Sequence, residues 1–115
     1  MKKLLLLSAL LIVSCSSFKS GLTVPANQTF ILGEYNDKNY SAQLKNKSNF
    51  TVIVKAIDKN SGTITQSIGL GAKGKTKIYI DKNETVYLKN LNKTDAKIDV
   101  SLSKGVEGMR YIDNN

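Results

Sequence analysis

The sequence lacks histidine and tryptophan, and among its 115 residues it has a single cysteine, Cys15, and a single proline. Without histidine, neither a Ser-His-Asp triad nor a histidine-based metal site can form, and one cysteine cannot make an internal disulfide. No cluster of acidic residues replaces these groups as a general base. We therefore expect a protein that is not an enzyme, with no cofactor and with no catalytic or metal-binding residue.

Arginine is nearly absent too, because Arg110 is the only one, so the formal net charge of +8 comes from lysine. Proteins that read nucleic-acid sequence favour the planar, bidentate guanidinium group, so we expect no nucleic-acid partner. A lysine-rich surface could attract anionic envelope polymers or lipid head groups, or it could serve only to keep the protein soluble. The sequence does not indicate an oligomeric state.

The amino terminus carries the clearest signal in the chain. Two lysines, Lys2 and Lys3, precede an apolar run over residues 4–13, and Ser14 and Cys15 follow it. This run is too short to cross the ~30 Å hydrocarbon core of a bilayer as a permanent helix. Residues 1–14 are therefore interpreted as a cleaved signal peptide.

The end of this segment, Ile12-Val13-Ser14-Cys15, resembles the lipobox of bacterial lipoproteins, which follows a type II signal peptide. The resemblance implies that the Cys15 thiol receives a diacylglyceryl group and that the bond between Ser14 and Cys15 is cut. The new amino terminus would then be acylated, for example with palmitate. The alternative is a conventional signal peptide in which Cys15 is incidental.

The resemblance also implies a location. Two acyl chains hold a protein stably at a membrane, so the lipid anchor makes the membrane a partner. Ser16 follows the cysteine, where an aspartate would favour retention at the inner membrane, so we expect the outer membrane of a bacterial cell envelope. The remainder of the chain only loosely resembles small, uncharacterised β-sandwich lipoproteins of Gram-negative bacteria.

Composition divides the mature chain into two parts. Residues 15–27 combine the lipidated cysteine with small polar residues and Pro25, so they are predicted to form a tether. Residues 28–115 are long enough for one domain, and we predict a single β-domain.

The β-domain is predicted from a regular rhythm of turns. Polar clusters start 10 to 13 residues apart, at residues 36–39, 46–49, 58–62, 71–74, 81–83 and 92–94. The runs between them are rich in Val, Ile, Thr and Tyr and alternate with period two, and none has a helical period. This pattern predicts an all-β fold, a small antiparallel β-sandwich or partly open barrel of about seven short strands, after the cleaved signal helix.

Hairpin pairing is then predicted from the alternation. Residues 50–57 and 63–70 would pair around the loop 58–62, with Val52 opposite Ile68. Residues 75–80, 84–89 and 96–102 would form a three-stranded meander, with Ile78 opposite Val86 and Leu88 opposite Ile98. In the first pair the predicted inward-facing residues are Phe50, Val52, Val54, Ala56, Ile64, Gln66, Ile68 and Leu70. Elsewhere in the domain they are Phe30, Leu32, Tyr40, Ala42, Leu44, Ile78, Ile80, Val86, Leu88, Ile98, Val100 and Leu102. The last run, residues 106–112, could be a closing strand or a partner motif, and the strand is favoured.

The outer face of the predicted meander is the candidate binding surface. It would bring together two tyrosines and three lysines, namely Lys75, Lys77, Tyr79, Tyr87 and Lys89. Tyrosine can stack on sugar rings and lysine can pair with carboxylates or phosphates, although both are also ordinary residues of an exposed strand. We expect a non-catalytic binding or accessory module that contacts an envelope protein or an anionic glycan. The alternative is an inhibitor or immunity-type lipoprotein directed against a cell-wall hydrolase or toxin.

Overall fold

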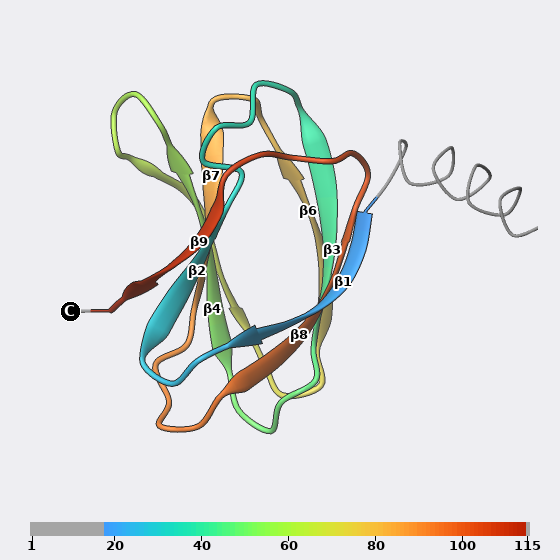
Figure 1. Ribbon diagram of the computed structural model, residues 1–115, viewed down its shortest axis with the longest axis vertical. Helices are drawn as coiled ribbons and strands as arrows, with labels where there is room; N and C mark the ends of the chain where they lie inside the picture. The colour runs from blue at the N-terminus through green and yellow to red at the C-terminus, as the bar shows by residue number, and fades with distance from the viewer. Residues whose placement is uncertain (1–17, 115) are drawn as a thin grey trace, which may run out of the picture.

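The computed structural model describes residues 18–114, which form nine antiparallel strands in two sheets (Figure 1). The strands are β1 (Phe18–Val24), β2 (Gln28–Leu32), β3 (Tyr40–Asn46), β4 (Val52–Asp58), β5 (Ile64–Leu70), β6 (Lys75–Ile80), β7 (Glu84–Lys89), β8 (Ala96–Leu102) and β9 (Met109–Asp113). The predicted signal peptide, its cleavage site and Cys15 lie outside the described residues. The prediction of an all-β sandwich is confirmed, with nine strands in place of about seven.

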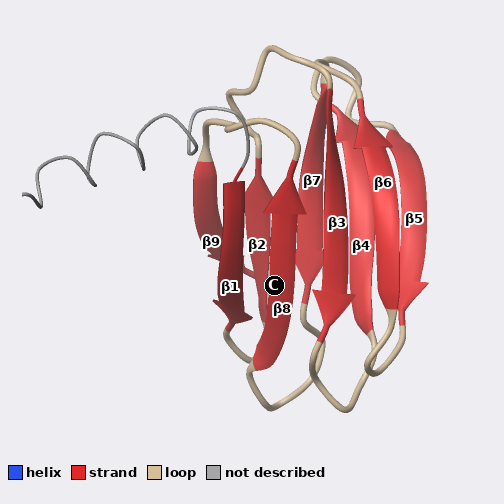
Figure 2. Cartoon of the chain, turned by 90° about the vertical axis from the view of Figure 1, so that its right-hand side faces the viewer, coloured by secondary structure: helices blue, strands red, loops and turns tan. Residues whose placement is uncertain are grey.

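The two sheets face each other across one core. Sheet A has the order β1-β8-β3-β6 and sheet B the order β5-β4-β7-β2-β9, and Figure 2 shows sheet A in front of sheet B. The first eight strands thus have the order of a jelly roll, an eight-stranded sandwich built from two Greek keys. Strand β9 adds a fifth strand to sheet B beside β2.

The predicted core is confirmed except at Ile64. The predicted inward-facing residues outside the β4–β5 hairpin are each at most 7% exposed, and Val52, Val54, Ala56 and Leu70 of the hairpin are buried with them. Phe50 and Ile68 are only partly buried, and Ile64 is 50% exposed. Burying a side chain of the size of Leu or Ile contributes about 1.5–3 kcal/mol, so this core is the main source of stability in a chain with no disulfide. The alternation of apolar and polar residues alone was sufficient to find it, because it fixes which face of each strand turns inward.

The predicted tether is wrong over residues 18–24. These residues form β1, which pairs with β8 along its whole length, from Phe18 opposite Leu102 to Val24 opposite Ala96. Val24 is fully buried and Leu22 packs against the core. The small polar residues around them resemble a linker in composition, but pairing with β8 and burial of the apolar positions determine the structure. Residues 18–24 therefore belong to the folded domain, which was predicted to begin at residue 28.

The β4–β5 hairpin forms, but its predicted register is off by two residues. Val52 lies opposite Leu70 and Val54 opposite Ile68, and a bulge after Ala56 shifts the pairing near the turn. A shift by two residues keeps each side chain on its predicted face because side chains alternate with period two. Beyond the bulge this fails for Ile64, which was predicted to point inward and is 50% exposed. The bulge adds the extra residue that a simple loop count omits.

The predicted meander of β6, β7 and β8 is wrong. Strand β6 pairs with β3, and β8 pairs with β1 and β3, all in sheet A, whereas β7 pairs with β2 and β4 in sheet B. The three-residue link Asp81–Asn83 therefore crosses from one sheet to the other. A short polar link with alternating flanks suits a hairpin and a crossing equally well, so the local sequence does not distinguish them.

A buried asparagine holds the link from β3 to β4, which also crosses between the sheets. The Asn46 side chain is fully buried, and its Nδ2 donates to the carbonyl oxygens of Phe50, Leu70 and Gly71 at 2.7, 3.0 and 3.1 Å. Its Oδ1 accepts from the Ser48 N–H at 2.9 Å. These bonds satisfy backbone groups that the crossing removes from the sheets, where an unpaired group is costly.

Asn90 repeats this arrangement at the link from β7 to β8. It is fully buried, and its Nδ2 donates to the carbonyl oxygens of Val24, Pro25 and Thr94, while its Oδ1 accepts from the Asn92 N–H. Both asparagines bond the N–H two residues later and the carbonyl four residues later. The two links that cross between the sheets are therefore stabilised by the same hydrogen-bond pattern of a buried asparagine.

Strand β9 confirms the favoured prediction for the end of the chain and is tied to the β2–β3 loop. Arg110 donates to both carboxylate oxygens of Glu34, from Nε at 2.7 Å and from Nη2 at 2.8 Å. This bidentate bond lowers the pKa of Glu34 below its ordinary value. Gly108, with φ of +88°, accepts backbone hydrogen bonds from Gly33 and Glu34 just before the strand.

Candidate binding groove on sheet A

The outer face of sheet A carries a groove of about 770 Å³ that extends over all four strands, and we call it the sheet A groove. The outer face of sheet A is turned toward the viewer in Figure 2, where β1, β8, β3 and β6 lie side by side. The volume of the groove falls within the range of about 300–1,000 Å³ that is usual for ligand sites. The groove is therefore large enough to hold several units of a polymer or one small ligand.

Cross-strand register fixes which side chains are neighbours in the groove. One row across the strands β1, β8, β3 and β6 contains Lys19, Ser101, Gln43 and Lys77. The next row, in the same strand order, contains Gly21, Asp99, Lys45 and Lys75. Polar and charged residues alternate along each of these strands with the buried core residues, so the same pattern that builds the core also builds this face.

The groove is strongly basic. Lys19, Lys45, Lys75 and Lys77 line it, and Asp99 is the one acidic residue among its lining residues. Lys45 and Lys75 lie directly opposite each other on β3 and β6. Neighbouring strands are about 4.8 Å apart, which is less than the ~8 Å Debye length at physiological ionic strength, so these charges act together on a bound anion.

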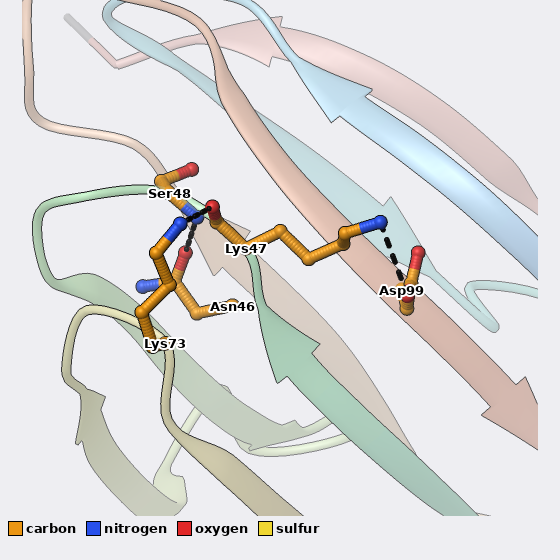
Figure 3. Close-up of polar contacts among 5 residues, drawn as sticks. All are labelled: Asn46, Lys47, Ser48, Lys73 and Asp99. Atoms are coloured by element: carbon orange, nitrogen blue, oxygen red, sulfur yellow. Dashed lines mark hydrogen bonds and ion pairs between the residues drawn. The ribbon is translucent and has the colours of Figure 1, made fainter.

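The link after β3 contacts Asp99, one of the lining residues of the groove (Figure 3). The Lys73 Nζ donates to the Lys47 carbonyl oxygen at 2.7 Å, and the Lys47 Nζ lies 3.8 Å from Asp99 Oδ2. The side chains of Lys47 and Asp99 are both about half exposed, at 54% and 51%, so solvent weakens this ion pair. Asp99 therefore stays available to a ligand.

The structure divides the predicted five-residue surface between the two sheets. Lys75, Lys77 and Tyr79 lie on β6 in sheet A, whereas Tyr87 and Lys89 lie on β7 in sheet B. The five residues do not form one surface, because the meander that would have joined them does not exist. Tyr79 is 69% exposed, with the Lys77 Nζ 5.4 Å from its ring centroid.

Sequence reasoning missed the true neighbours of β6. Lys19 was assigned to the tether, and Gln43 and Lys45 on β3 were not connected with β6. The alternation does predict that Gln43 and Lys45 point away from the core, since Ala42 and Leu44 point into it. Only the strand order places them beside Lys75 and Lys77.

Residues 18–114 contain no group of three or more His, Cys, Asp or Glu side chains placed to hold a metal ion. In the same part of the chain no helix is long and apolar enough to cross a membrane. The groove offers ammonium groups, an amide, a hydroxyl and one carboxylate. This set can bind an anion and form hydrogen bonds.

Comparison with known proteins supports the fold alone. No known protein family and no curated protein matches the sequence. Among solved structures, similar ones are Peruvianin-I, a cysteine peptidase from Thevetia peruviana latex (TM-score 0.56, 12% identity), and a mutant of Bacillus subtilis oxalate decarboxylase (TM-score 0.57, 13% identity). The first match covers 85% of this chain and the second covers 92%, but the chain spans only 56% and 26% of the length of those proteins.

A third similar structure is that of Bacillus endospore appendages, described as disulfide-linked pili. It has a TM-score of 0.55 and 11% identity, with 79% of this chain and 86% of the other covered. These proteins differ from one another in function. The likeness therefore concerns the arrangement of strands.

Proposed function

We propose that this protein is a non-catalytic bacterial envelope lipoprotein, anchored through Cys15, that binds an anionic envelope polymer in the sheet A groove. The lipobox-like sequence supports the anchor and the outer-membrane location. The jelly roll supplies a rigid sheet on which the groove lysines of three strands, β1, β3 and β6, stand in fixed positions. Such clustered charge raises the local concentration of an anionic partner and speeds its association.

The observation that carries this proposal is the direct pairing of Lys45 with Lys75. Like charges directly opposite each other on neighbouring strands destabilise a sheet. Lys77 and Lys19 in the next row add charge to the same face. An anionic ligand removes this repulsion when it binds, so a cost to folding becomes a contribution to binding.

The binding test removes three groove lysines together, as Lys45→Gln, Lys75→Gln and Lys77→Gln. The matched control makes the same change in net charge at exposed loop positions, as Lys38→Gln, Lys82→Gln and Lys104→Gln. The lipidated mature chain, from Cys15 onward, would be titrated in neutral detergent with sodium polygalacturonate and with polyphosphate.

At about 1 kcal/mol per lysine near an anionic surface, the three changes remove about 3 kcal/mol, so the groove variant should bind at least one of these polymers roughly a hundredfold more weakly at low salt. It should also be at least as stable as the wild type, because repulsion is relieved. The control should retain most of the binding. Equal losses in the two variants would show that net charge and not the groove determines binding.

The anchor is tested separately by Cys15→Ser and cell fractionation. The variant should remain unprocessed at the lipobox and should lose its acyl chains. Processing and membrane association like those of the wild type would contradict the proposed anchor.

A further inference from the structure

We infer that the sheet A groove takes an acidic polysaccharide, a ligand with both hydroxyl and carboxylate groups, and not a polyanion held by charge alone. This inference rests on the proposed function and specifies its ligand class. It follows from the residues that lie between the lysines, and above all from Asp99.

The centre of the groove differs from its sides. Lys19 stands on edge strand β1, and Lys75 and Lys77 stand on edge strand β6. The two central strands contribute Ser101, Gln43, Asp99 and Lys45. Among the described residues, the side chains of Gln43 and Ser101 have no hydrogen-bond partner, so an amide and a hydroxyl are free at the floor.

A site that binds a polyanion by charge alone should have no carboxylate in its basic face, but Asp99 lies there. It lies between Gly21 on β1 and Lys45 on β3, in the middle of the basic face. An ionised carboxylate accepts hydrogen bonds and repels anions. It therefore weakens the binding of a polymer such as polyphosphate, whereas it can accept hydrogen bonds from the hydroxyl groups of a sugar.

One oxygen of Asp99 is open toward the ligand. Oδ2 is the atom that lies near the Lys47 ammonium group. Oδ1 has no hydrogen-bond partner among residues 18–114, and a Cβ on Gly21 would lie 3.7 Å from it. The space above Oδ1 is thus the space that a side chain at position 21 would occupy.

The glycine at position 21 has no backbone explanation. Its φ is not positive, and the register between β1 and β8 runs through it without a bulge. Glycine within a strand weakens the strand and often marks a place where a ligand approaches closely. We assign Gly21 this role, because it leaves Asp99 Oδ1 accessible from the β1 side.

Tyr79 supplies an apolar surface beside the lysines. Its ring is 69% exposed at the β6 edge of the sheet, two residues from Lys77. An exposed tyrosine ring can pack against the face of a sugar ring and leave its hydroxyl in solvent. Ammonium groups, a free carboxylate oxygen and an aromatic ring together match the carboxylates, hydroxyls and ring faces of an acidic polysaccharide.

The test compares two probes of similar charge, sodium polygalacturonate, which has hydroxyl groups, and polyphosphate, which has none. Asp99→Asn is the first variant, and Asp95→Asn, on the link before β8, is its charge-matched control. In the lipidated mature chain, Asp99→Asn should weaken polygalacturonate binding about five- to tenfold and strengthen polyphosphate binding about two- to fivefold. Asp95→Asn should change both affinities in the same direction and by less than twofold.

Gly21→Val is the second variant, because valine suits a strand and should close the space above Asp99 without unfolding the domain. It should weaken polygalacturonate binding at least fivefold while thermal stability is retained. Gly105→Val, at an open position in the β8–β9 loop, should leave binding unchanged.

The outcomes separate the two proposals. If Asp99→Asn strengthens the binding of both polymers equally, Asp99 only reduces the positive charge of the groove. The inference about the polysaccharide is then overturned, although the proposal that the groove binds anionic polymers is not. Tighter binding to phosphatidylglycerol vesicles than to polygalacturonate would make the ligand a membrane surface and would also overturn the inference. If the wild type binds neither polymer, the proposed function itself fails.

Discussion

Replacing Asn46 by alanine should destabilise the domain far more than its position in a polar loop suggests. The substitution removes four hydrogen bonds, and two of them, to the Leu70 carbonyl oxygen and from the Ser48 N–H, are buried. A buried backbone group left without a partner costs about 1–3 kcal/mol. The other two carbonyl oxygens, of Phe50 and Gly71, are only partly buried and can bind water in its absence.

Counting the two buried groups alone, we expect Asn46→Ala to lower the free energy of unfolding by roughly 2–4 kcal/mol. This is a large share of the 5–15 kcal/mol that is typical of a domain. With an m-value of about 1.5 kcal/mol/M, the midpoint of urea unfolding should fall by roughly 1–3 M. Circular dichroism at increasing urea concentration measures this shift.

Asn49 provides the matched control. It lies in the same link, makes the same chemical change on substitution and is exposed. Asn49→Ala should change stability by no more than about 0.5 kcal/mol. Asn46→Asp adds a second comparison, because it preserves size and the acceptor but places a carboxylate against three carbonyl oxygens, so it should cost at least as much as alanine. Similar midpoints for the Asn46 and Asn49 alanine variants would refute this account of the crossing.

Three further predictions concern other parts of the fold. The hydrogen bond from Arg110 lowers the pKa of Glu34, so the contribution of this pair to stability is present above the ordinary carboxyl pKa and is lost as the pH falls through the lowered pKa; the melting temperatures of wild type and Glu34→Gln should differ at pH 7 and converge as the pH falls below that lowered pKa. Gly108→Ala should cost more than about 1 kcal/mol in urea unfolding, since its φ is positive and a Cβ would lie 2.7 Å from a backbone nitrogen, whereas Gly105→Ala should be neutral. Tyr40→Phe should leave the free energy of unfolding unchanged or raise it by about 1 kcal/mol, because the buried Tyr40 hydroxyl lacks a hydrogen-bond partner within residues 18–114. A lower free energy of unfolding in urea would show that the hydroxyl has such a partner, and would contradict this prediction.

The sequence predicts the faces of strands well and their neighbours poorly. Val86 and Leu88 were correctly placed in the core, because their burial depends only on alternation along β7. Their partners were not, because β7 pairs with β2 and β4, from which it is separated by tens of residues. A strand with one apolar face can bury that face beside any other strand with the same alternation of apolar and polar residues. The choice of partner therefore depends on how all the strands pack together.

The candidate site was limited by the same ambiguity. The lysines and the tyrosine of β6 could be found from their outward positions, but a groove needs at least two strands whose adjacency is known. Gly21 shows the point most clearly. In the sequence it belongs to a stretch of small polar residues typical of a linker. Its proposed role in the groove can be inferred only from the structure, where it lies opposite Asp99.

The correction to the tether changes what the proposed anchor would allow. Strand β1 begins at Phe18, three residues after Cys15, and three extended residues reach at most roughly 11 Å. A lipid on Cys15 would therefore hold the domain against the head groups, and a tether of thirteen residues would not. Lys19, which lines the groove, stands in the second residue of this strand, so the β1 side of the groove would lie nearest to the membrane. A polysaccharide that reaches Asp99 over Gly21 would then enter the groove from the side nearest to the bilayer, which favours polymers that are themselves close to the membrane over those spread through the wider envelope.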